Sequence, residues 1–214
     1  MPFLVRGFTM VESVIVLAII VLIAAIVLAN FPGFSQAINL QRSGQELALA
    51  FRRAQSLALA VREVDITCPL ASPPNPSGVC LSGITPGRHL PQSYGVSIDF
   101  AKDQTSYIIF ADFRGEESSS ADGIYQAADD VVVEKIPLIG NGNFISTMVT
   151  TGPGSDTQRR TVINVTFSVP DANMTIANDR QALTAQTVQI TLQGQSLTFT
   201  KTVTVRSTGQ IGLK

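Results

Sequence analysis

The strongest constraint on this chain is an uninterrupted apolar run near its N-terminus. Residues 14–29, VIVLAIIVLIAAIVLA, include no polar side chain, and together with residues 8–13 they make a run of about 22 residues. At roughly 1.5 Å of rise per residue, a helix of that size crosses a bilayer core of about 30 Å. The segment therefore has to lie in lipid or in an equally dry protein interior.

The rest of the chain has a different character. With 214 residues, the chain has room for one domain of ordinary size beside this helix. Charged residues make up 14% of the sequence, below the usual quarter, and the formal net charge is −1 with no block of Lys or Arg. Neither a nucleic acid nor an acidic substrate is therefore expected as the main partner.

A single carboxylate, Glu12, interrupts the start of the apolar run. A secretory signal peptide cut after Ala29, or a plain membrane anchor, would each explain the run alone. Neither explains Glu12, because a charge costs about 2.5–3.5 kcal/mol at the centre of a membrane helix and somewhat less near its end. The charge therefore requires a partner.

The segment MPFLVRG followed by FTMVES resembles the cleavage and methylation region of type IV prepilins. The resemblance implies that a prepilin peptidase removes the leader after Gly7 and that Phe8 becomes an N-methylated N-terminus. It also implies that Glu12, fifth in the mature chain, meets the new amino group of a neighbouring subunit. Two groups that are costly in lipid would then neutralise each other.

The same resemblance implies the location and the partners. The chain would cross the inner membrane once, with its N-terminus in the cytoplasm as Arg6 on the leader also favours, and its head would lie outside. It would then enter an extracytoplasmic filament. The implied partners are membrane lipid, the prepilin peptidase, the inner-membrane assembly platform and other pilin or pseudopilin subunits.

Beyond the apolar run, Pro32 and Gly33 predict a kink or a melted turn within residues 30–33. The helical pattern then resumes, which gives a leader at 1–7, an assembly helix at 8–30, a stalk helix at 31–63 and a head at 64–214. The stalk helix is expected to pack through one stripe of apolar or small residues: Leu40, Gly44, Leu47, Phe51, Ala54, Ala58 and Val61.

The stretch ELALAFRRAQSLALAVREVDIT resembles the helix-to-strand segment of H-class minor pseudopilins of type II secretion and of the related T-class minor pilins. This implies a minor structural subunit. A DNA- or surface-binding minor pilin and a major pilin remain as alternatives. The DNA alternative is weakened because Lys201, Arg206 and Lys214 are spread along the end of the chain, with Gln210 between them.

The head is expected to be β-rich, so that the fold class is α+β, with a long N-terminal helix packed against one or two antiparallel sheets. In the clearest alternation, one face is expected to point inward with Ile163, Val165, Phe167 and Val169, and the other to point outward with Asn164, Thr166 and Ser168. The strands are expected at residues 64–67, 94–100, 106–111, 131–138, 144–149, 162–169, 174–177, 188–192 and 197–206.

An acidic loop follows the third of these strands, and its oxygen atoms make calcium a candidate ligand. Asp112, Asp122 and Asp129 are the candidate ligands, but the spacing does not match an EF-hand, because Gly115 comes too early. The alternative is a solvated turn with acidic residues. No cofactor is required by the sequence.

Two other residue types carry chemistry. Cys68 and Cys80 flank a Pro/Ser-rich stretch that a disulfide would close in an exported domain, and two unpaired thiols are the alternative. His89, in a Gly/Pro-rich segment, is expected to be a surface residue. The sequence has no Ser-His-Asp set, no nucleophile elbow and no phosphate-binding glycine loop, and we therefore expect no enzymatic activity.

Overall fold

The computed structural model describes residues 9–66, 87–113, 122–127, 130–140, 142–195 and 199–214. A long N-terminal helix precedes antiparallel β-sheets, which confirms the α+β class. In chain order the elements are α1 (Met10–Leu59), β1 (Val64–Ile66), β2 (Gly87–His89), β3 (Ser93–Asp99), β4 (Ser106–Asp112), β5 (Val131–Pro137), β6 (Phe144–Thr151), η1 (Pro153–Ser155), β7 (Thr157–Arg159), β8 (Val162–Ser168), β9 (Met174–Ala177), β10 (Ala182–Leu183), β11 (Thr187–Gln193), β12 (Thr200–Arg206) and β13 (Ile211–Leu213).

Helix α1 contributes to two compact units, Met1–Ile38 and Asn39–Lys214. Its backbone stays helical through residues 30–33, so the expectation of a melted turn there is wrong, and the alternative, a kink, stays a prediction. Pro32 lacks one backbone donor, but the helical residues on both sides keep their own hydrogen bonds and hold the backbone in register. The second unit, called the head below, contains the rest of α1 and all the strands.

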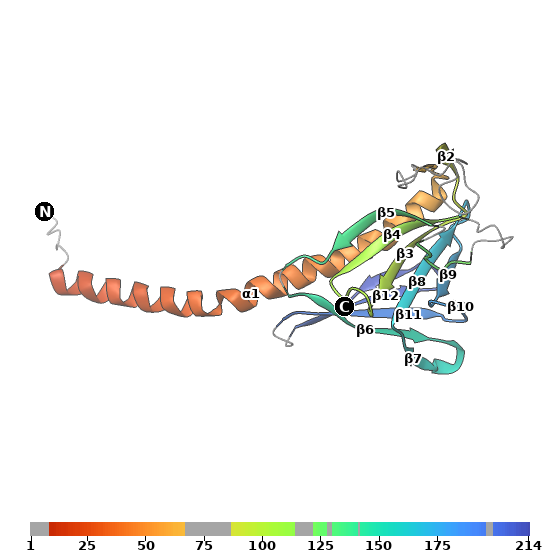
Figure 1. Ribbon diagram of the computed structural model, residues 1–214. Helices are drawn as coiled ribbons and strands as arrows, with labels where there is room; N and C mark the ends of the chain where they lie inside the picture. Colours follow the sequence, from red (N-terminus) through yellow and green to blue (C-terminus); the bar gives the residue numbers. More distant parts are fainter. Residues whose placement is uncertain (1–8, 67–86, 114–121, 128–129, 141, 196–198) are drawn as a thin grey trace, which may run out of the picture. The chain divides into compact units, whose positions relative to one another are not determined.

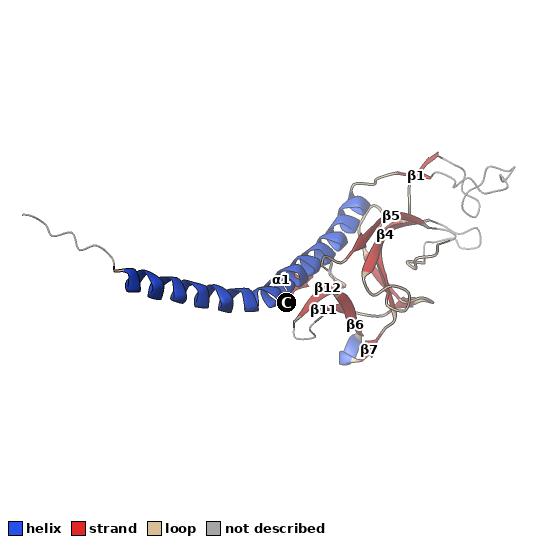
Figure 2. Ribbon diagram, turned by 60° about the vertical axis from the view of Figure 1, so that its left-hand side comes forward, coloured by secondary structure: helices blue, strands red, loops and turns tan. Residues whose placement is uncertain are grey.

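The strands of the head form two sheets and a short ribbon, all with antiparallel pairing (Figures 1 and 2). One sheet has the order β10-β9-β8-β3-β4-β5, and the other has the order β13-β12-β11-β6-β7. Strands β1 and β2 pair with each other. The expectation of one or two sheets is therefore confirmed, with the β1-β2 ribbon in addition.

The core of the head lies between the two sheets and the C-terminal part of α1. The predicted stripe is buried along this part of the helix, with Leu40, Leu47, Phe51, Ala54 and Ala58 each at most 1% exposed. They join one cluster with side chains from both sheets, including Ile109, Ile163, Phe167, Ile145, Ile190 and Val203. The helix is thus the element that both sheets cover with their apolar faces.

Val61 departs from the predicted stripe, because it is 44% exposed. Helix α1 ends at Leu59, and Val61 has a φ of 49°, in the left-handed region that usually ends a helix with glycine. The Arg62 amide then donates to the Leu57 carbonyl. The chain therefore leaves the helix one turn before the pattern predicts, and Val61 no longer follows the buried face.

Strand β8 is buried on both faces. Ile163, Val165 and Phe167 point into the core as predicted, but Asn164 and Thr166 on the other face are only 1% and 2% exposed. We call this second face of the six-stranded sheet the outer face. The expectation that it is solvated is wrong, because residues 122–126, called the strap below, lie over it.

Several contacts hold the strap on the outer face. The Gly123 backbone lies close to Thr166, since a Cβ built on Gly123 would fall 3.0 Å from the Thr166 Oγ1. The ring of Tyr125 meets the ring of Phe110 edge-on, with 5.3 Å between centroids. Ile124 is 8% exposed. The strap therefore gives the polar residues of this face a cover of their own.

Gly95 makes room for this arrangement at the middle of β3. It pairs with Phe110 on one side and Thr166 on the other. A Cβ built on Gly95 would fall 2.5 Å from the Thr166 Cγ2 and 2.7 Å from the Phe110 ring. No real Cβ tolerates such distances, so the ring of Phe110 can lie against the sheet only because Gly95 has no side chain.

We expect Gly95→Ala to lower the free energy of unfolding by about 1–3 kcal/mol, because the added methyl group overpacks the outer face. Urea unfolding of the detergent-solubilised chain, followed by tyrosine fluorescence, measures this. Gly212→Ala is the matched control, since a Cβ at Gly212 meets nothing within 4 Å. Equal stability of the two variants would contradict this account of Gly95.

Candidate functional site

The N-terminal part of α1 exposes apolar side chains on every side. Each described side chain from Met10 to Leu28 is exposed, and the most apolar window of the helix has a mean hydropathy of 3.2. A helix with no polar face does not gain stability from water on any side. This segment is long and apolar enough to span a membrane.

Thr9 and Glu12 organise the start of this helix. The Glu12 amide donates to the Thr9 Oγ1 at 3.3 Å, and the Ser13 amide donates to the Thr9 carbonyl at 3.2 Å. Thr9 is therefore an N-cap, and Glu12 lies three residues after it, where acids favour the helix dipole. The sequence carries a signal for this cap that the expectations above did not include, Thr-x-x-Glu directly before an apolar run.

Several predicted site residues lie outside the described residues. Gly7 and Phe8 at the predicted cleavage point belong to this set, as do Cys68, Cys80 and Asp129. The cleavage and the disulfide therefore stay predictions. Of the predicted assembly residues, Glu12 is described, and its side chain is exposed in the first turn of α1.

Asp112 and Asp130 are buried at the two ends of the acidic loop, at 1% and 6% exposure. The Asp112 Oδ2 accepts hydrogen bonds from the Ser93 hydroxyl at 2.9 Å and from the Gly123 amide at 3.1 Å. Asp130 accepts from the amides of Phe113 at 3.1 Å and Gln126 at 2.7 Å. For these two acids the solvated-turn interpretation is wrong, because they anchor the strap.

Burial sets the protonation behaviour of these two carboxyl groups. Desolvation raises the pKa of Asp112 to about 6 and the pKa of Asp130 to about 7. The hydrogen bonds that these groups accept, from the Ser93 hydroxyl and from backbone amides, oppose this only in part. The nearby charge of Asp122 raises both values further, and Asp112 also raises that of Asp130. Both carboxyl groups are therefore mainly protonated below about pH 6 and ionise as the pH rises through neutrality.

Calcium binding stays a prediction, because Asp129 and residues 114–121 of the acidic loop lie outside the described residues. The exposed Asp122 accepts hydrogen bonds from the Ile124 amide and the Gln126 side chain, both within its own loop. Among the residues that the structure describes, no group of three or more His, Cys, Asp or Glu is placed to hold a metal ion. The carboxylate oxygens of Asp112, Asp122 and Asp130 accept hydrogen bonds from backbone amides of the strap.

His89 lies in a strand and not in the loop expected from its Gly/Pro-rich surroundings. It is the last residue of β2 and pairs with Val64 of β1, and its side chain is partly exposed. Two short segments far apart in sequence thus form a ribbon that neither would form alone.

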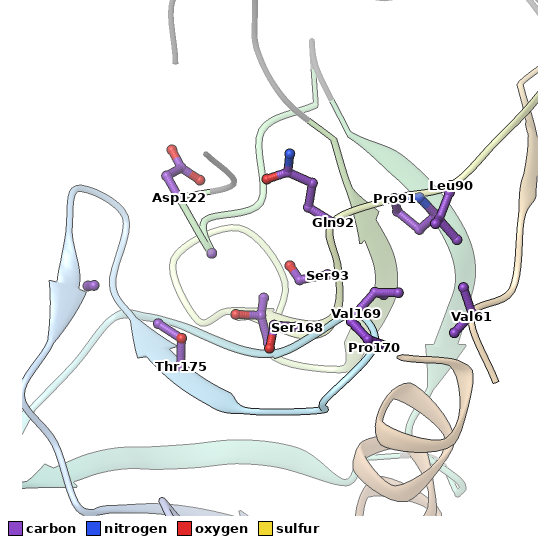
Figure 3. Close-up of a pocket in the computed structure, with 13 residues that line it drawn as sticks. Val61, Leu90, Pro91, Gln92, Ser93, Asp122, Ser168, Val169, Pro170 and Thr175 are labelled. Carbon is purple, nitrogen blue, oxygen red and sulfur yellow. The ribbon is translucent and has the colours of Figure 1, made fainter. Parts of the chain in front are cut away.

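A groove of about 1050 Å³ lies beside the strap, and Asp122 and Gly123 of the strap are among the residues that line it (Figure 3). Its polar end carries Asp122, Ser168 and Thr175, whereas Val61 and Pro170 lie at its apolar end. Asp122 is the one charged residue among the described residues that line it. The groove is thus open and weakly acidic.

The structure thus defines a class: an α+β protein with a β-sheet head and one N-terminal helix apolar enough to span a membrane. Comparisons with protein-family models, with curated proteins and with solved structures find no match.

The anchoring acids lead to a prediction about pH. Because their folded pKa values lie above the ordinary value of 3.8, the stability they contribute is complete below about pH 4 and is lost as the pH rises through 6 and 7. We expect the free energy of unfolding to fall between pH 5 and pH 8 by an amount on the order of 2 kcal/mol.

Urea unfolding of the full chain in detergent at a series of pH values measures this dependence. Asp103 does not confuse the result, because hydrogen bonds from Ser106 and Thr105 hold its pKa below 3.8 and its effect lies at more acid pH. In the double variant Asp112→Asn with Asp130→Asn, the slope should largely vanish. An unchanged slope in that variant would refute the assignment.

Proposed function

We propose that this chain is a structural subunit of a type IV pilin-like filament, a minor pilin or pseudopilin, and that it has no catalytic role. One observation carries the proposal: a helix that exposes apolar side chains on all sides from Met10 to Leu28 and has one carboxylate, Glu12, in its first turn. Such a helix can leave lipid only for another dry environment, and the packed helices of like subunits provide one.

The energetics of Glu12 support a partner outside its own helix. An acid in the first turn gains about 0.3–1 kcal/mol from the helix dipole. Placing a charge inside a membrane helix costs about 2.5–3.5 kcal/mol at the centre. Near the end of the helix the cost of burying the charge is smaller. In the dry interior of a helix bundle the full cost applies again, and the favourable interaction with the helix dipole is too small to offset it. The amino group at Phe8 of a neighbouring subunit would supply the missing charge.

A head with two sheets favours the minor role over that of a major building subunit. The six-stranded and five-stranded sheets enclose a core of their own with the C-terminal part of α1. In the proposed filament the N-terminal part of α1 packs with other subunits, while the head remains available at the surface or the tip. This supports a subunit of a type II secretion pseudopilus or of a type IV pilus.

Processing is the first test of the proposal. We expect mass spectrometry of the mature protein to show an N-terminus at Phe8 with one added methyl group, since the leader would be removed after Gly7. A first residue at Asn30 would establish a signal peptide instead. An intact chain beginning at Met1 would establish a plain anchor.

The charge of Glu12 is the second test. Glu12→Gln keeps a side chain that suits the third position of a capped helix but removes the charge. We expect normal cleavage and membrane insertion but at least about tenfold less incorporation into filaments, because breaking a buried ion pair costs about 3–5 kcal/mol. Quantitative immunoblotting of sheared filaments against the membrane fraction measures this.

Ser13→Ala is the matched control in the same helical turn, since it changes a neighbouring polar side chain without changing charge. It should enter filaments normally. If Glu12→Gln also enters them normally, Glu12 acts only as a capping residue and the pairing with Phe8 is wrong.

A further inference from the structure

The turn between β8 and β9 contains a short motif with the pattern of an N-glycosylation acceptor. Residues 173–175 are an asparagine, a methionine and a threonine, which fits Asn-x-Ser/Thr with a residue other than proline in the middle. In this modification the asparagine side chain receives a sugar, and the transferring enzyme recognises the hydroxyl two residues later. Residues 164–166, Asn-Val-Thr, have the same pattern. The exposure of each motif therefore decides which of them an enzyme can reach.

The motif in β8 is closed to an enzyme. Asn164 and Thr166 are only 1% and 2% exposed, and β8 pairs with β3 on one side and with β9 on the other. The Asn164 Nδ2, which would have to receive the sugar, donates to the Asn178 carbonyl at 2.9 Å. A close-packed face has no room for a sugar on this nitrogen, so the folded head cannot carry one there.

The motif in the turn is open to an enzyme. Asn173 and Thr175 are both exposed. Within the part of the chain that the structure describes, neither of these two side chains has a hydrogen-bond partner, so a transfer reaction does not have to break one. Asp171 is exposed as well, and it occupies the place two residues before the asparagine where some oligosaccharyltransferases also require an acid.

The backbone of the turn holds the asparagine and the threonine on the same side. The Ser168 amide donates to the Asn173 carbonyl at 3.0 Å, which extends the pairing of β8 with β9 by one residue beyond Met174. Side chains two residues apart on a paired strand point to the same face. Thr175 lines the open groove of Figure 3. An enzyme can therefore approach the asparagine amide and the threonine hydroxyl together.

We propose that Asn173 is an N-glycosylation site of the head. The inference rests on the proposed function in one respect, because a head outside the cytoplasm meets the membrane enzymes that transfer lipid-linked oligosaccharides. The donor is an oligosaccharide on a polyprenyl diphosphate. The Asn173 Nδ2 forms a bond to the anomeric carbon of the first sugar, and the bond from that carbon to the diphosphate oxygen breaks. The polyprenyl diphosphate leaves with the electron pair, and the amide loses one proton to a base of the transferase.

The test uses the full chain, extracted with detergent from the membranes of its own cells. Trypsin cuts after Arg160 and after Arg180 with no Lys or Arg between them, so both motifs lie on one peptide of residues 161–180. Mass spectrometry of this peptide with electron-transfer dissociation assigns an added sugar to an individual residue. We expect a sugar on Asn173 and none on Asn164. A peptide without sugar, or one with its sugar on any other residue, overturns the proposal.

Three variants test the motif itself. Asn173→Gln and Thr175→Ala should each abolish the modification, because the first displaces the amide and the second removes the hydroxyl that the enzyme recognises. Thr175→Ser keeps a hydroxyl at that position and is the matched control, so its peptide should still carry sugar. Both positions are exposed, and urea unfolding establishes that each variant folds. Sugar that persists in Thr175→Ala, or that is lost altogether from Thr175→Ser, contradicts the proposal.

The intact mass of the same sample reports on the proposed function separately. A chain that begins with methylated Phe8 but carries no sugar overturns the glycosylation and leaves the filament subunit standing. A glycosylated chain that still begins at Met1 overturns the processing after Gly7 and leaves the glycosylation standing. The two proposals can therefore fail independently.

Discussion

The rest of this structure depends on the solvation of one helix. Up to Leu28 the described side chains of α1 are exposed with no polar face, and from Leu40 onward one stripe of the same helix is buried by two sheets. The first part is long and apolar enough to span a membrane, whereas the second part packs into the core of the head. One continuous helix therefore has two parts that suit different environments, apolar surroundings for the first part and the protein core for the second.

Close packing fixes the position of the C-terminal part of α1 within the head. A Cβ on Gly44 would fall 2.8 Å from the Leu213 Cδ1, so β13 approaches the helix backbone closely there. Arg53 pairs with Glu134 of β5, and the Tyr94 hydroxyl donates to the Arg62 carbonyl, three residues beyond the end of the helix. The five-stranded sheet and the six-stranded sheet thus each have a contact with α1 that depends on its position, and a hydrogen bond from β3 fixes the segment that follows the helix.

The sequence predicted those parts of the fold that have a local pattern. The stripe from Leu40 to Ala58 follows helical periodicity. Strands β1, β3, β4, β5, β6, β8, β9 and β11 have boundaries within two residues of those expected. Strands β2, β7, β10 and β13 were missed, because each has only two or three residues and pairs at a sheet edge or in the ribbon. Their pairing depends on the partner strand and not on their own propensity.

The candidate sites were harder to predict from the sequence than the strands, because they depend even more on contacts between residues far apart in the chain. Small polar residues on the outer face, such as Ser97 and Thr166, have the alternation of a solvated surface, and only the strap makes them buried. The strap itself depends on Asp112 and Asp130, whose carboxylates accept hydrogen bonds from donors up to nineteen residues away in the sequence. Periodicity and propensity describe residues that are close in the sequence, so they cannot predict such hydrogen bonds. Gly95 was the available signal, since a glycine at the middle of a long strand indicates a close approach, here by the Phe110 ring.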